Sequence, residues 1–88
     1  MTETELIQRG WNAKALLESP TWQACFAELD TRWVTSIRRT GALDTDMRES
    51  LYAHISALDA IKAQLEAWAH EGDTTEKMLK RKTEDQHG

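Results

Sequence analysis

The sequence predicts an all-α protein: a long antiparallel helical hairpin with a further helix at its N-terminal side and a polar C-terminal tail. Residues that favour helices are abundant, whereas the 88 residues include only 4 glycines and 1 proline. Apolar residues recur at steps of three and four, which is the spacing of one helix face, and no segment shows the alternation of a strand. Two short boundary segments divide this pattern into three helices, and short connections place neighbouring helices antiparallel.

The first helix is predicted over residues 3–18. Thr2 and Glu5 have the spacing of a capping box, in which each side chain satisfies a free backbone amide at the helix start. Gly10 lies inside this helix, where glycine costs about 1 kcal/mol relative to alanine. It indicates either a close approach of another helix or a weak point.

The second helix is predicted over residues 20–39. Ser19 is a good N-cap and Pro20 a good first helical residue, and the residue before a proline avoids helical geometry. The first helix should therefore end at Ser19. The second helix carries a strong apolar stripe, made of Trp22, Phe26, Leu29, Trp33 and Ile37. Cys25 flanks this stripe, and we expect it to be a small buried side chain.

The third helix is predicted over residues 45–71, after a turn that contains Gly41. Asp46 and Glu49 give it a capping-box spacing. Seven successive positions alternate at steps of four and three, the pattern of a coiled-coil seam, and all but the histidine are apolar or aromatic: Met47, Leu51, His54, Leu58, Ile61, Leu65 and Trp68.

Gly72 is expected to end the third helix. The helical domain would then cover residues 1–72. Residues 73–88 are polar and offer little apolar cover, so we expect a tail that forms a short helix or is disordered until a partner orders it.

The second helix is shorter than the seam of the third helix, so it cannot cover all of that seam. A single layer of three helices leaves one broad face open, and we expect a second copy or another protein to cover it. The alternative is a compact monomeric three-helix bundle. The side chains expected at the interface or in the core are Trp22, Phe26, Trp33, His54, Leu58, Ile61, Leu65 and Trp68. As a polar seam residue, His54 would set register or oligomer state.

No sequence pattern indicates catalysis. The chain has no glycine-rich phosphate loop, no HExxH and no nucleophile elbow. His54 has no second metal ligand at a suitable spacing, and Cys25 has no catalytic histidine at a readable spacing. We therefore expect no enzymatic activity, no catalytic residue, no cofactor and no metal.

The sequence sets only loose limits on the compartment in which the protein works and on its partners. Cys25 is the only cysteine, which fits a reducing compartment such as the cytosol. No apolar run has the length of a transmembrane helix, and the segment MTETELIQRG lacks a signal core. A net charge of −4 argues against a general nucleic-acid binder. Nucleic-acid contact through Arg32, Arg38 and Arg39 stays an alternative, although arginines also suit a helix C-terminus.

Two segments, ALLESPTWQACFAELDTRWV at 15–34 and DMRESLYAHISALDAIKAQLEAWAHEGD at 46–73, resemble small helical proteins of tailed bacteriophages and prophages. Such proteins are encoded in head-morphogenesis or packaging gene clusters. The resemblance implies a structural or assembly protein that self-associates or docks on a larger morphogenesis protein, in the bacterial host cytoplasm or the virion. It brings no catalytic residue. A small DNA-packaging subunit and an inhibitor of a host protein are the alternatives.

Overall fold

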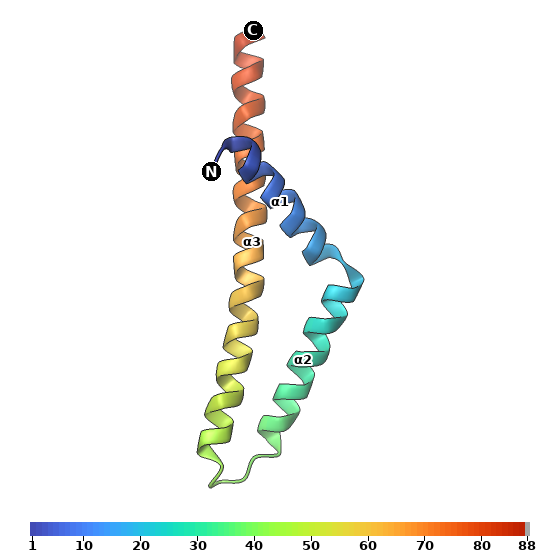
Figure 1. Cartoon of the computed structure of the whole chain (residues 1–88), viewed down its shortest axis with the longest axis vertical. Helices are drawn as coiled ribbons and strands as arrows, with labels where there is room; N and C mark the ends of the chain where they lie inside the picture. Colours follow the sequence, from blue (N-terminus) through green and yellow to red (C-terminus); the bar gives the residue numbers. More distant parts are fainter. Residues whose placement is uncertain (88) are drawn as a thin grey trace.

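The protein is an all-α chain of three helices, as the sequence predicts. The computed structural model describes the backbone of residues 1–87 and the side chains of residues 1–84. The helices are α1 (Glu3–Glu18), α2 (Pro20–Arg38) and α3 (Thr45–His87), and no strand occurs within the described range. Figure 1 shows α1 crossing the much longer α3 near its own N-terminal end and then, followed end to end by α2, running along one side of α3.

The predicted starts of α1 and α2 are confirmed by their caps, whereas Asp46 lies inside the first turn of α3 rather than at its cap. The Thr2 hydroxyl accepts a hydrogen bond of 3.1 Å from the Glu5 amide, and the Glu5 carboxylate accepts one from the Thr2 amide, which completes the capping box. Ser19 has extended backbone angles and its hydroxyl accepts from the Trp22 amide at 3.4 Å. One residue therefore ends α1 and caps α2, and the chain bends there.

The loop between α2 and α3 is held by side chains on both of its ends. The Gly41 amide donates to the Asp44 carboxylate at 3.0 Å. Arg48, in the first turns of α3, donates to the Thr40 hydroxyl at 3.0 Å and to the Gly41 carbonyl at 2.7 Å. These bonds fix the reversal that makes α2 and α3 antiparallel.

The expected end of the third helix at Gly72 is wrong, because α3 continues without interruption to His87. No glycine in the described residues has the positive φ that marks a helix-terminating glycine. Ion pairs one turn apart support the continuation: Asp73 with Lys77 at 3.0 Å and Glu76 with Lys80 at 3.5 Å. Residues 73–87 are thus an extension of α3 rather than a separate tail.

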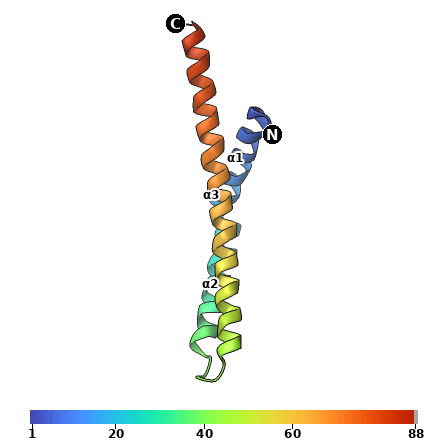
Figure 2. The same ribbon diagram turned by 90° about the vertical axis from the view of Figure 1, so that its left-hand side faces the viewer.

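The molecule is long and flat. Its extents are 68 × 23 × 18 Å and its radius of gyration is 19.3 Å, whereas a compact domain of this length has about 12 Å. Seen edge-on, α2 lies behind the lower half of α3 while the N-terminal part of α1 swings out from its upper half (Figure 2). The upper end of α3 projects beyond both shorter helices (Figure 1).

Little of the chain is enclosed. In the described residues, the buried apolar side chains are Ala13 at 3% exposure, Leu58 at 8% and Leu65 at 9%. The contact of α1 with α3 is more extensive than that of α2 with α3, so the hairpin itself is the looser of the two pairings. The best-packed region is therefore the place where α1 crosses α3.

Candidate functional site

The helices α1 and α3 touch through two glycines. A Cβ atom added to Gly10 would lie 2.8 Å from the Gly72 Cα and 3.0 Å from the Trp68 carbonyl oxygen. A Cβ added to Gly72 would lie 2.8 Å from the Gly10 Cα and 3.0 Å from the Leu6 carbonyl oxygen. Only a residue without a side chain fits on either helix, because the neighbouring atoms belong to backbone.

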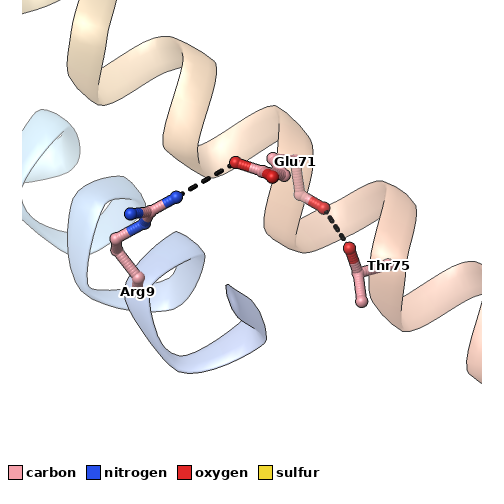
Figure 3. A network of polar contacts seen from close by, with 3 residues as sticks. All are labelled: Arg9, Glu71 and Thr75. Carbon is pink, nitrogen blue, oxygen red and sulfur yellow. Dashed lines mark hydrogen bonds and ion pairs between the residues drawn. The ribbon is translucent and has the colours of Figure 1, made fainter. Parts of the chain in front are cut away.

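Arg9 links the two helices beside these glycines. Its Nη2 atom lies 3.1 Å from the Glu71 Oε2 atom, and the Glu71 carbonyl accepts a 2.8 Å hydrogen bond from the Thr75 hydroxyl (Figure 3). The guanidinium carbon lies 4.6 Å from the centre of the Trp68 ring, within the range of a cation–π contact. We call Arg9, Gly10, Trp68, Glu71 and Gly72 the crossing.

A second polar link lies one turn further along α3. The Trp11 indole Nε1 atom donates to the Glu76 Oε2 atom at 3.0 Å, although Trp11 is 54% exposed. Glu76 also pairs with Lys80. The crossing is therefore extended by an indole that is held at the surface rather than buried.

The chemistry of the crossing is that of a structural contact. Arg9 and Glu71 are partly open to water, with side-chain exposures of 29% and 50%, and such ion pairs contribute little by themselves. Beside them, hydrogen bonding and charge from Lys77 hold the pKa of Asp73 below its ordinary value. No group of three histidine, cysteine or acidic side chains gathers as metal ligands in the part of the chain that the structure describes.

Where α1 meets α2, both helices stand away from α3 (Figure 1). The space beneath them is a hollow of about 370 Å³. Trp22 and Phe26, whose ring centres are 4.7 Å apart, form its α2 wall, and Leu58 lies on its α3 wall. Charged side chains at its rim are Asp30, Asp59 and Lys62.

A further hollow of about 460 Å³ lies beside the crossing. Leu16 and Ala13 from α1 and Leu65 and Trp68 from α3 contribute its apolar lining. Leu16 is 38% exposed, so this hollow continues into open apolar surface. The two hollows show that the three helices do not close around a core.

The predicted interface or core residues divide into two groups. Leu58 and Leu65 are buried within the chain, and half-buried aromatic side chains accompany them: Trp22, Phe26, Trp33 and Trp68. His54 and Ile61 are exposed, Ile61 at 50%. The seam of α3 is thus partly used by α1 and α2 and partly left open.

His54 contacts its own chain. Its Nδ1 atom lies 2.6 Å from the Ser50 carbonyl oxygen, so Nδ1 carries the hydrogen. Its ring meets the ring of Trp33 edge-on, with centres 5.3 Å apart and planes at 71°. His54 therefore helps to hold α2 on α3, and a role in setting the register of an oligomer stays a prediction.

The arginines considered for nucleic-acid contact lie on α2 and at its end. Arg32 pairs with Glu28 at 3.6 Å, and Arg38 and Arg39 are exposed. Cys25 is exposed as well, which corrects the expectation that it is buried. Cys25 lies at the edge of the α2 stripe, where the limited contact between α2 and α3 leaves it uncovered.

Sequence reasoning missed Arg9, Glu71 and Gly72 as a unit. The signal was the pair of glycines, one inside each of two strong helical patterns. Gly10 indicates a close approach, but Gly72 is equally typical of a helix end. Only the continuation of α3 past residue 72 makes the two glycines partners.

The chain matches no protein-family model, no curated protein and no solved structure. Within the described residues, none of the helices combines the length and the apolar character needed to cross a membrane.

Proposed function

We propose that the protein is a non-enzymatic assembly protein that works through helix-mediated self-association and protein–protein contact. The observation that carries this proposal is the absence of a closed core over the described residues: three buried apolar side chains serve helices that span 68 Å. Even a compact domain of this size buries only roughly 60% of the surface that its unfolded chain exposes, so its stability is marginal and depends on further cover. A chain of this shape gains that cover from another chain.

The exposed area supports the proposal. The chain exposes 6759 Å², whereas a compact monomer of 10.1 kDa exposes about 5,300 Å². The excess is about 1,500 Å² per chain, which is larger than the share of one partner in a standard protein–protein interface. The large apolar side chains exposed at this surface are Met1, Trp11, Leu16, Leu43, Met47, Tyr52, Ile61 and Met78.

The setting we propose is the assembly of a tailed bacteriophage or prophage, in the host cytoplasm or the virion. Its support is the resemblance of residues 15–34 and 46–73 to small helical proteins of head-morphogenesis and packaging clusters. A larger morphogenesis protein would then be the second partner of the self-associated form.

The test is the absolute mass in solution, measured by light scattering behind a sizing column from micromolar to hundreds of micromolar. We expect a mass of two or more chains, and a midpoint of thermal unfolding that rises with protein concentration, because association stabilises the folded state by mass action. A monomer of 10.1 kDa that unfolds cooperatively at a concentration-independent temperature would contradict self-association.

A further inference from the structure

We propose that a second copy of the chain covers one face of α3, with the two α3 helices antiparallel and a two-fold axis near Gln64. This inference rests on the proposed self-association and adds the surface and the direction. We call the surface the Ile61 face; its members are Ala53, Ala57, Ile61, Gln64 and Trp68.

The Ile61 face is continuous, and only its Trp68 end is partly covered, by Arg9 of α1. Its residues follow at steps of three and four, so they lie on one side of the helix. The side chains that α1 and α2 cover, Leu58 and Leu65, lie on the adjoining side. Ala53, Ala57, Ile61 and Gln64 are all exposed, and Trp68 is half-buried.

The same face carries no charge over residues 50–68. The charged side chains of this stretch are Asp59, Lys62 and Glu66, and each lies on another side of the helix. At 1.5 Å per residue the uncharged face is about 27 Å long. In a chain whose residues are 30% charged, a stretch of this length indicates a surface that is covered in the working form.

The apolar area of α1 adds to this face. Leu16 lines the hollow beside the crossing together with Leu65 and Trp68, and Trp68 belongs to the Ile61 face. A helix laid along the face would therefore also close a hollow that α1 and α3 leave open.

The size of the exposed excess fits a second copy. The excess of about 1,500 Å² per chain is larger than the roughly 800 Å² that each partner contributes to a standard interface, so the elongated chain has enough exposed area for a homodimer interface. A two-fold interface also uses one surface twice, so a single uncharged face suffices.

Charge sets the direction of the two helices. The start of α3 is acidic, with Asp44, Asp46 and Glu49, and its one cation, Arg48, is held by the preceding loop. At the far end Lys77 and Lys80 are paired with Asp73 and Glu76, which leaves Arg81 and Lys82 as the cations outside these pairs, next to the acid Glu84. A parallel pair would place like charges together, whereas an antiparallel pair sets Asp46 of one chain against Lys82 of the other. These two positions are equidistant from Gln64, which therefore lies at the axis.

Single-cysteine cross-linking of the full chain in a Cys25→Ser background tests this arrangement. We expect Gln64→Cys to form a disulfide-linked dimer at micromolar concentration at least tenfold faster than Glu66→Cys, an exposed control two residues away on the other side of α3. An equimolar mixture of Asp46→Cys and Lys82→Cys should cross-link faster than either variant alone.

The outcomes separate this inference from the proposed function. Equal rates for Gln64→Cys and Glu66→Cys in a protein of dimeric mass would overturn the Ile61 face while leaving self-association intact. Rapid cross-linking of Asp46→Cys with itself would overturn the antiparallel direction. A monomeric mass for the parent protein would overturn both, and the face would then belong to a foreign partner.

Discussion

Gly10 and Gly72 are in backbone contact across 62 residues of sequence, and each fills the position that a side chain on the other would need. Neither glycine ends a helix or forms a turn. Both therefore serve the close approach of α1 to α3, which brings Arg9 within reach of Trp68 and Glu71. The crossing depends on this approach, and its parts can be tested separately.

Replacing Gly72 by alanine should destabilise the protein although alanine favours a helix. The helix gains about 1 kcal/mol, but the new Cβ would stand 2.8 Å from the Gly10 Cα, and overpacking against rigid backbone costs about 1–3 kcal/mol. We expect a net loss of up to about 2 kcal/mol in the free energy of unfolding, measured by chemical denaturation. Gly10→Ala should behave alike.

Gly41→Ala is the matched control for these glycine substitutions. Its added Cβ would meet only the Asp44 carboxylate, at 3.5 Å, and its φ is not positive. We expect a change of at most about 0.5–1 kcal/mol, in the stabilising direction, because alanine restricts the unfolded chain. Equal losses at positions 41 and 72 would show that the glycine contact is not what the substitutions disturb.

Arg9 should contribute more to the free energy of unfolding than Glu71, its partner in the ion pair. Arg9→Ala removes the ion pair, the contact with Trp68 and the packed stem of the side chain, for about 1–2 kcal/mol in total. Glu71→Ala removes only a partly exposed ion pair, for about 0–1 kcal/mol. Arg9→Met should cost less than Arg9→Ala, because it keeps the stem and removes the buried Nε, which has no partner. Chemical denaturation of the three variants measures the three losses of stability and thus ranks them.

The pKa of Asp73 reports whether α3 continues past Gly72. Lys77 lowers this pKa through a hydrogen bond and its charge, and the pair forms only when both residues occupy successive turns of one helix. A lowered pKa contributes stability above the ordinary pKa of an aspartate, and that contribution is lost as the pH falls through the folded value. NMR titration of the carboxyl carbon should show a rise on Lys77→Met.

The reverse result is equally informative. If Lys77→Met leaves the titration of Asp73 unchanged, the Asp73–Lys77 ion pair does not form in solution. His70 and Lys14 lower the same pKa by weaker charge effects, so His70→Gln should raise it less than Lys77→Met.

Local rules predicted the helices and their starts. Thr2, Ser19 and Pro20 act within one turn of their own position, so the sequence around them determines the outcome. Gly72 was misjudged for the opposite reason. A glycine after an apolar stripe resembles a helix end, and its true partner, Gly10, lies in another helix.

The sequence also could not predict which residues of the α3 seam are covered by α1 and α2 and which are left exposed. The periodic pattern identified Leu58, Ile61 and Leu65 as one stripe. It could not show that α1 and α2 would cover Leu58 and Leu65 but leave Ile61 half exposed, because that depends on the angle at Ser19 and the tilt of α1 across α3. Coverage is a tertiary property, whereas periodicity is local.

Ile61→Asp should dissociate the dimer without unfolding the helices. In the free chain Ile61 is 50% exposed, so a carboxylate there is solvated, but in the proposed dimer two carboxylates would be buried close to the axis. The loss of apolar burial and the cost of desolvation amount to about 4 kcal/mol per dimer, or roughly a thousandfold weaker association. Tyr52→Asp is the matched control, since Tyr52 is 55% exposed on the other side of α3. Sedimentation equilibrium of both variants gives the two constants, and equal weakening by both substitutions would place the interface elsewhere.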